Sequence, residues 1–153
     1  MIERVDHLEV YARDIQETLD FYIDILGFQM WRHTHMVRDD GSDFDLACIR
    51  MGDMMVEIIQ APPEMLDQEV DQARMGMRMF ALRVGNMAET IATLESKGVE
   101  VFQAPRASQV FEGLRAEIVD PNGMRIELRE WQRGDDFFND GWEPSTPNVT
   151  KLN

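Results

Sequence analysis

The stretch MRMFALRVGN at residues 77–86 repeats the pattern of VDHLEVYARD at residues 5–14, with a shift of 72 positions. Each stretch ends in a polar residue, Asp14 or Asn86, and a glutamate follows three residues later. This spacing is typical of a capping box, in which the first side chain accepts a backbone N–H of the first helical turn. The sequence therefore predicts, twice, a strand that leads into a capped helix.

The residues after each cap have the spacing of an amphipathic helix. Apolar residues recur every three or four positions, which places them on one helix face. A glycine, Gly27 or Gly98, then stands where a helix end favours a left-handed residue. We expect buried stripes formed by Ile15, Leu19, Tyr22 and Leu26 in the first helix and by Met87, Ile91 and Leu94 in the second.

Extended, turn-separated segments follow both helices. MMVEIIQ at residues 54–60 and MRIELRE at residues 124–130 each place a glutamate, Glu57 or Glu127, between apolar residues. DPNG at residues 120–123 predicts the hairpin between the last two strands, because proline presets φ and glycine accepts a positive φ. A unit of one strand, one helix and about three strands is thus used twice.

The predicted fold class is α+β, with two tandem βαβββ modules. The first module comprises residues 1–63, and a polar, partly helical linker follows at residues 64–76. The second module comprises residues 77–131, and residues 132–153 form an acidic, aromatic C-terminal tail.

Composition and charge exclude several classes of function. The chain of 153 residues has 15 basic and 29 acidic residues, a net charge of -14, whereas nucleic acids and anionic membranes bind positive surfaces. No segment approaches the about 18 apolar residues of a membrane span. The single cysteine, Cys48, excludes an internal disulfide, and the N-terminus lacks the features of a signal peptide. We expect a cytoplasmic protein that binds neither nucleic acid nor membranes.

The tandem βαβββ pattern resembles the vicinal oxygen chelate superfamily. The resemblance rests on a histidine in the first strand, FYIDILGF at residues 21–28, and DPNG followed by RIEL, and it covers residues 2–131. This superfamily includes glyoxalase I, methylmalonyl-CoA epimerase, fosfomycin and bleomycin resistance proteins, and extradiol dioxygenases. The resemblance implies a glyoxalase-like fold, in which the modules form a cupped, mainly antiparallel sheet with the site on its concave face.

The resemblance also implies a set of metal ligands on the first and last strands of each module. Carried onto this sequence, these positions are His7, Glu57, Met79 and Glu127. Met79 departs from the pattern, because a thioether prefers soft ions, whereas imidazole and carboxylates suit Mn²⁺, Fe²⁺, Co²⁺, Ni²⁺ or Zn²⁺. The expectation is one divalent ion on His7, Glu57 and Glu127, with positions left open for substrate oxygens. In the alternative, these three residues line the cup without metal.

Two histidines and one arginine are further candidates for the site. His33 and His35 lie two residues apart, so on a strand they share one face. Either one is a general base in the cup, or both face solvent on an outer strand. Arg115 either anchors a substrate carboxylate or phosphate or only neutralises Glu117.

Sulfur-containing and aromatic residues complete the candidates. Met75, Met77 and Met79 alternate as on one strand face, where they either fill the core or form a hydrophobic wall for a substrate. Met79 belongs to the site through its repeat partner, and Trp31 is a candidate for packing or for stacking on a ligand. Cys48 is expected to be a buried small residue without a catalytic role.

Two functions are consistent with the resemblance. In the first, the protein is a metal-dependent lyase, isomerase or epimerase. The ion chelates two vicinal substrate oxygens and stabilises an enediolate, while Glu57, Glu127, His33 or His35 moves the proton. In the second, the protein is a metal-free relative of the bleomycin resistance members that sequesters a small molecule, and the acidic charge favours a cationic guest.

An extradiol dioxygenase is a third possibility. That chemistry uses two histidines and one glutamate in this superfamily, whereas this chain has one histidine and two glutamates at the matching positions. The resemblance further implies a homodimer, and the aromatic segment FFNDGW at residues 137–142 would suit its interface.

Overall fold

The computed structural model describes residues 4–71, 75–132, 147–150 and 152. The predicted tail contact of FFNDGW falls outside these described residues. The chain divides into two compact units. The first is Met1–Val70 together with Pro121–Gly123, and the second is Asp71–Asp120 together with Met124–Asn153.

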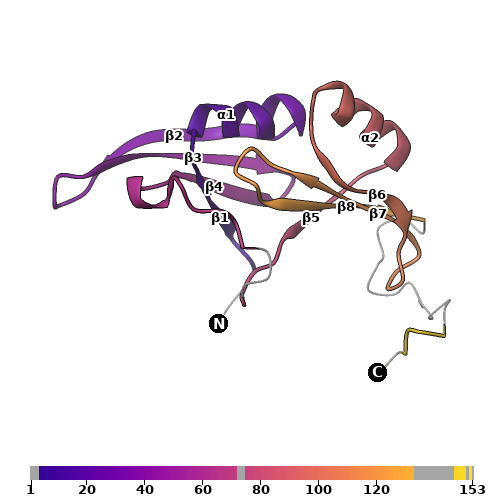
Figure 1. The fold of residues 1–153 in the computed structure, drawn as a ribbon. Helices are drawn as coiled ribbons and strands as arrows, with labels where there is room; N and C mark the ends of the chain where they lie inside the picture. The colour runs from indigo at the N-terminus through magenta and orange to yellow at the C-terminus, as the bar shows by residue number, and fades with distance from the viewer. Residues whose placement is uncertain (1–3, 72–74, 133–146, 151, 153) are drawn as a thin grey trace. The chain divides into compact units, whose positions relative to one another are not determined.

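The first unit has one four-stranded sheet and one helix (Figure 1). The strand order is β1-β4-β3-β2, with β1 parallel to β4 and the other neighbours antiparallel. A helix follows β1, continues into a π-helical turn at Phe21–Ile25, and packs against β4. A short 3-10 turn, Pro63–Met65, follows the last strand. The elements are β1 (His7–Ala12), α1 (Ile15–Asp20), β2 (Gln29–Val37), β3 (Asp43–Met51) and β4 (Met54–Gln60).

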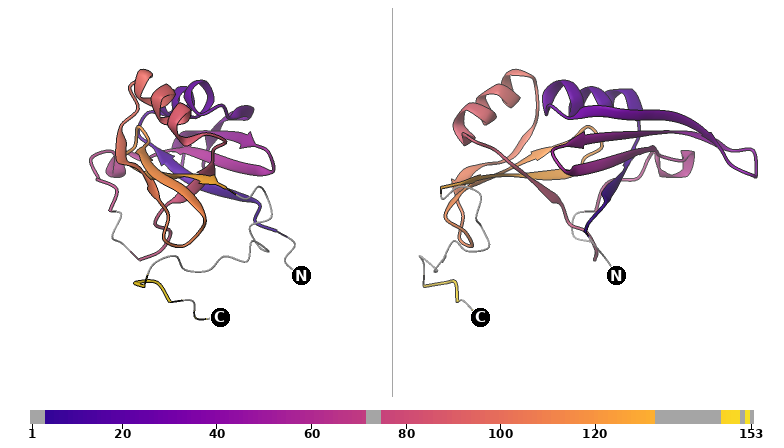
Figure 2. Two further views of the ribbon diagram at one scale, coloured as in Figure 1. Left: turned by 90° about the vertical axis from the view of Figure 1, so that its right-hand side faces the viewer. Right: turned by 180° about the vertical axis from the view of Figure 1, so that it is seen from behind.

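The second unit repeats this arrangement. Its strand order is β5-β8-β7-β6, with β5 parallel to β8 and the other neighbours antiparallel. The helix packs against β6, β7 and β8, and Figure 2 shows that each helix lies on one side of its own sheet. The elements are β5 (Phe80–Arg83), α2 (Met87–Ser96), β6 (Val101–Ala107), β7 (Gly113–Val119) and β8 (Arg125–Trp131). The predicted α+β fold of two βαβββ modules is confirmed.

Both predicted helix caps are present. The Asp14 carboxylate accepts the N–H of Glu17 at 2.9 Å, and the Asn86 side-chain oxygen accepts the N–H of Glu89 at 3.1 Å. The three apolar residues predicted for α2 are all buried. The stripe predicted for the first helix is only partly correct, because the π-helical turn changes its periodicity. There the buried residues are Leu19, Phe21, Tyr22 and Phe28, while Ile15 and Leu26 remain partly exposed.

The turn at residues 120–123 joins β7 to β8 as predicted. Gly123 has a φ of +88°, and the Asp120 carboxylate accepts the N–H of Met124 at 2.8 Å. Asn122 belongs to the first unit. Its side chain accepts the backbone N–H of Arg13 at 2.8 Å and donates to the hydroxyl of Thr18 at 3.0 Å. Buried Thr18 therefore has a polar partner.

The methionines before β5 do not fill the core. Met75 is 96% exposed and Met77 is 58% exposed, and β5 begins only at Phe80. The expectation that these residues alternate on a strand was wrong, because residues 75–79 precede the strand and pair with none of the described strands. Among the described residues, no helix is long and apolar enough to cross a membrane.

Candidate metal centre

Strand alternation gives the first sheet a buried face and an open face. Val56 and Ile58 of β4 are fully buried, and the intervening Glu57 therefore points to the opposite side. Glu9 of β1 lies directly opposite Glu57 in the register of the two strands, and residues in such pairs share a face. His7, two residues before Glu9, lies on this open face as well. The fold thus brings together His7, Glu9 and Glu57.

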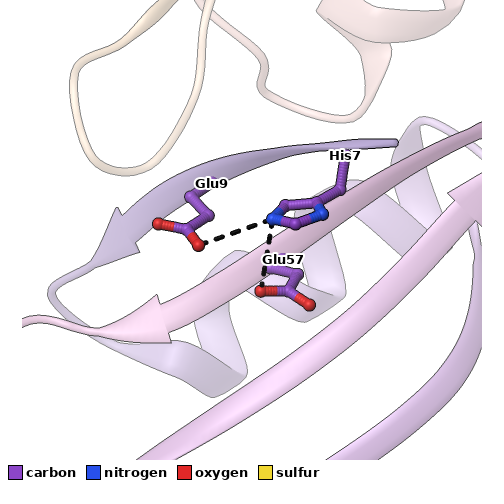
Figure 3. A group of neighbouring side chains, drawn as sticks. All are labelled: His7, Glu9 and Glu57. Atoms are coloured by element: carbon purple, nitrogen blue, oxygen red, sulfur yellow. Dashed lines mark ion pairs between the residues drawn. The ribbon is translucent and has the colours of Figure 1, made fainter. Parts of the chain in front are cut away.

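The three side chains converge on a small volume (Figure 3). Nε2 of His7 lies 3.5 Å from Oε1 of Glu9 and 3.8 Å from Oε2 of Glu57. One ligand atom from each residue lies within 4.8 Å of the others. Ligand atoms bound about 2.1 Å from one ion lie roughly 3 to 3.5 Å apart, so small side-chain rotations bring these three onto a common ion. The residues present fit a divalent cation.

A fourth carboxylate orients the imidazole. Oδ2 of Asp6 lies 3.0 Å from Nδ1 of His7, so Nδ1 carries the proton of the neutral ring and Nε2 presents its lone pair to Glu9 and Glu57. Metal-binding histidines commonly have such a carboxylate partner on the other ring nitrogen. The hydrogen bond to Asp6 raises the pKa of His7, more than partial burial lowers it, and Glu57 and Glu9 add to the rise.

Cys48 packs beside this group without joining it. It is 4% exposed, lies opposite Glu57 in the register of β3 and β4, and its thiol lies 3.7 Å from Oε1 of Glu57. Burial raises the pKa of the Cys48 thiol, and the charge of Glu57 raises it further. A thiol in this environment stays protonated at neutral pH, and the prediction that Cys48 is a buried small residue is confirmed.

The two strand histidines do not join the group. His33 pairs with Ala47, and His35 pairs with Asp45, so both lie on the face opposite to Glu57. Both are exposed on β2, which is an edge strand. The prediction that they line the cup is therefore corrected in favour of the solvent-facing alternative. The physical reason is register, since two histidines on one strand share a face but the sequence does not say which face.

Within the first unit, Trp31 lies outside the group of His7, Glu9 and Glu57, whereas Met79 belongs to the second unit. Trp31 is the unpaired residue at an irregularity in β2, between Met30 and Arg32 in the register. It is 55% exposed, and the Arg32 guanidinium lies 4.9 Å from its ring centroid. Met79 is half-buried directly before β5 in the second unit.

Glu127 has a different environment from its repeat partner Glu57. It is buried in the second unit, and both of its carboxylate oxygens face arginines. Nε of Arg129 lies 2.7 Å from Oε2, and Nε of Arg115 lies 2.9 Å from Oε1, the latter without hydrogen-bond geometry. Arg115 also pairs with buried Glu117, which is the neutralising role left open for it by the sequence.

The two repeats therefore differ in residue type at two of the three positions of this group. The residues of the second unit that match His7, Glu9 and Glu57 are Met79, Ala81 and Glu127. Only the first unit has three ligand-type side chains at these positions. Among the described residues, no lysine or arginine pairs with Glu9 or Glu57. Their negative charge is left for a cation to compensate.

Sequence reasoning missed Glu9. The available signal was the alternation in HLEVYA, because a residue two positions after His7 shares its strand face. The parallel pairing of β1 with β4 then places Glu9 opposite Glu57, and this pairing joins segments about fifty residues apart that local spacing cannot relate.

Comparisons with known proteins agree with this architecture. A model of the Glyoxalase/Bleomycin resistance protein/Dioxygenase superfamily matches residues 6–118. The chain is 25% identical over 131 residues to the uncharacterized protein YwkD of Bacillus subtilis, covering 85% of this chain and 98% of YwkD. It is 28% identical over 131 residues to the uncharacterized protein YaeR of Escherichia coli, covering 84% and 97%. A solved glyoxalase family protein from Enterococcus faecalis is 25% identical, with a TM-score of 0.68 and coverage of 84% and 98%.

Proposed function

Because this chain belongs to the glyoxalase/bleomycin resistance protein/dioxygenase superfamily, we propose that it is a divalent-metal-dependent lyase, isomerase or epimerase. Its substrate is a small molecule with two adjacent oxygen atoms. The superfamily resemblance predicted from the sequence is confirmed by the family match. The metal dependence and the reaction are our inference from the group on the first sheet.

One observation supports the proposal more than any other. Nε2 of His7 and the carboxylates of Glu9 and Glu57 form a ligand set with a net charge of two minus when the imidazole is neutral. The equivalent carboxylate in the second unit, Glu127, has two arginine partners instead. A divalent ion in the first unit would supply the compensating charge that arginines supply in the second.

The side chains around this group have separate roles in the proposal. A bound divalent ion would supply Lewis acidity toward two neighbouring substrate oxygens. Asp6 keeps Nε2 of His7 turned to the ligand volume. Glu57, whose side chain is 21% exposed, is held beside Cys48, while Glu9 at 59% exposure has room to turn toward a substrate proton. We assign the proton transfer to Glu9.

Several predictions from the sequence stay predictions. These are the roles of Glu127 as a metal ligand together with His7 and Glu57 or as a base, of Glu57 as a base, and of Arg115, Met79 and Trp31 in substrate binding. The ion pairs of Glu127 argue against metal ligation, because a ligand carboxylate would have to leave two arginines. A Glu127→Gln variant removes the charge of this side chain without changing its shape. Its metal content therefore tests whether Glu127 is a metal ligand.

The test is the metal content of tag-free protein that has been stripped with chelator and then incubated separately with Mn²⁺, Fe²⁺, Co²⁺, Ni²⁺ and Zn²⁺. We expect about one bound ion per chain with at least one of these metals. Glu57→Gln should lose the ion, and Asp6→Asn should weaken binding by about 10- to 100-fold. Glu64→Gln, which removes an exposed carboxylate elsewhere in the first unit, is the matched control and should bind normally.

The metal contents of these variants distinguish between the possible ligand sets and a metal-free protein. Loss of the ion in Glu57→Gln but not in Glu127→Gln supports the ligand set of the first unit. Loss in both variants returns Glu127 to the ligand set. A wild-type chain that binds none of the five metals contradicts the proposal and favours a metal-free small-molecule binding protein. For the reaction itself, loaded protein should exchange a carbon-bound hydrogen of 2-hydroxycarbonyl substrates in D₂O, and Glu9→Gln should abolish this exchange.

A further inference from the structure

The hairpin of β2 and β3 carries two histidines and two aspartates on one face. His35 lies opposite Asp45 in the register of the two strands. His33 lies two residues before His35, and Asp43 two residues before Asp45, and such neighbours share a face of the sheet. This face is opposite to that of the candidate metal centre. We call the four residues the hairpin cluster and define it by His33, His35, Asp43 and Asp45.

The two carboxylates of the hairpin cluster lie at the two nitrogens of one imidazole. Nδ1 of His35 lies 2.8 Å from Oδ1 of Asp45, and Nε2 lies 3.6 Å from Oδ2 of Asp43. In the neutral ring, the hydrogen bond to Asp45 keeps the proton on Nδ1, so Nε2 presents its lone pair to Asp43. Metal-binding histidines commonly have such a carboxylate on the other ring nitrogen. The separation of Nε2 from Oδ2 is close to the roughly 3 to 3.5 Å between two ligands of one ion.

His33 supplies a second imidazole on the same face. Residues two positions apart on an antiparallel strand are separated by about 6.8 Å along it, so their side chains lie side by side. Both histidines are exposed on an edge strand, and His33 can therefore rotate toward Nε2 of His35 without opening the core. Two imidazoles and one carboxylate would fill three of the four positions around a tetrahedral Zn²⁺ ion.

The hairpin cluster is accessible to an ion from solvent. The turn between β2 and β3 extends beyond helix α1 (Figure 1 and Figure 2). The side chain of His35 is 60% exposed and that of Asp43 is 65% exposed. With both imidazoles neutral, the two carboxylates give the cluster a negative charge, which a bound cation would compensate.

The second unit provides an internal comparison. Its residues that match His35 and Asp45 are Ala107 and Leu114, which lie opposite each other on β6 and β7. Neither side chain offers a ligand atom. The βαβββ architecture therefore forms without histidine and aspartate at these positions, and the hairpin cluster is a property of the first unit alone.

We propose that the hairpin cluster is a second metal site, which binds a divalent transition-metal ion such as Zn²⁺ through His33, His35 and Asp43. Asp45 orients the ring of His35 without binding the ion. The site shares no residue with the candidate metal centre and does not rest on the proposed function. It binds its ion more weakly, because salt screens exposed charges and because ordering the His33 side chain costs conformational entropy.

Calorimetry of the full chain stripped of metal tests the proposal with Zn²⁺ as the probe. We expect two binding events, of which the weaker belongs to the hairpin cluster. His33→Gln should remove the weaker event and retain the stronger one, whereas Glu57→Gln should do the reverse. Asp45→Asn should weaken the second event by about 10- to 100-fold. Asp53→Asn, which removes an exposed carboxylate from the turn between β3 and β4, is the matched control and should bind as the wild type does.

The variants keep this proposal separate from the proposed function. If the candidate metal centre does not bind Zn²⁺, the wild type shows a single event, which His33→Gln should abolish and Glu57→Gln should leave unchanged. The weaker ion should be lost on passage into metal-free buffer, so the metal content measured after that step counts the candidate metal centre alone.

The histidine rings provide a second measurement, because the chain has three histidines in total. In ¹H–¹⁵N spectra of Glu57→Gln, addition of Zn²⁺ should shift the ring nitrogens of His33 and His35 and leave those of His7 in place. Three results would overturn the proposal. They are no Zn²⁺ binding by Glu57→Gln, binding that His33→Gln does not alter, and equal weakening by Asp53→Asn.

Discussion

The carboxylate of Glu57 lies 3.8 Å from the imidazole of His7, whereas the carboxylate of Glu127, its repeat partner, lies against Arg115 and Arg129. A backbone position that is the same in both repeats thus has two different charge environments. In the first unit the compensating charge is a protonatable ring, whose proton a metal ion can displace into solvent. In the second unit it is a pair of guanidinium groups, which stay charged at all relevant pH values.

His7 makes the proposed metal binding depend on pH. Its pKa is raised, first by the hydrogen bond to Asp6 and then by Glu57 and Glu9, and an ion must displace the proton from Nε2. Below the raised pKa, metal affinity should therefore fall about tenfold per pH unit. Competition with a chromophoric chelator between pH 5 and 8 measures this profile, which Asp6→Asn should move to lower pH. An affinity that does not change with pH would exclude His7 as a ligand.

His35 should titrate above an ordinary histidine even though it is exposed. The hydrogen bond to Asp45, at 2.8 Å, is the main cause of its raised pKa, and the charge of Asp43 adds to it. Because the pKa is higher in the folded state, the pair stabilises the fold fully below the unfolded pKa of about 6.5. This contribution disappears as pH rises through the raised pKa. NMR titration of the ring should show a lower pKa in Asp45→Asn, and an unchanged value would contradict the pairing.

Cys48 should resist thiol reagents in the native protein. Burial and the neighbouring Glu57 both raise the pKa of its thiol, and the reactive form is the thiolate. We expect negligible labelling by an aromatic disulfide reagent at pH 7.5 and stoichiometric labelling of one thiol per chain after unfolding in urea. Rapid labelling of the folded chain would show that β3 does not bury this side chain as described.

At the scale of the element, the first residue of β7 has a specific steric requirement. A Cβ placed on Gly113 would lie 2.0 Å from the backbone oxygen of Glu130 and 3.0 Å from the ring of Phe111. The neighbouring strand β8 is a backbone obstacle, which cannot move aside as a flexible side chain can. Glycine at this position therefore allows the close pairing of β7 and β8 at this end of the two strands.

Gly113→Ala should destabilise the fold by about 1–3 kcal/mol, the usual cost of overpacking. Gly85→Ala is the matched control, because nothing lies within 4 Å of its added Cβ and its φ is not positive. Urea denaturation of both variants measures the difference. Equal stability of Gly113→Ala and wild type would mean that β7 and β8 separate at this end at little cost.

At the scale of the whole molecule, the homodimer implied by the resemblance stays a prediction. One chain has a mass of 17.8 kDa. If the homodimer forms, light scattering of the full chain should give twice this mass. The measurement is best made at moderate salt, since a net charge of -14 on each chain opposes association at low ionic strength. A mass of one chain at all protein concentrations would contradict the predicted homodimer.

Local patterns predicted most of the fold. The two caps, the buried stripe of α2 and the turn at residues 120–123 each depend on residues within a few positions of one another, so spacing alone identifies them. The 72-residue repeat then predicts two like modules. The π-helical turn at Phe21–Ile25 was not predictable in this way, because no residue type in FYIDI marks it.

The sequence by itself determined the repeated architecture, two of the three residues of the candidate metal group, and the buried, unreactive character expected for Cys48. Only the tertiary structure decided that Glu9 joins His7 and Glu57, and that His33 and His35 lie on the opposite face. The physical reason is strand register. It brings together residues from distant segments and sets which face each side chain occupies, and a shift by one residue would reverse every face.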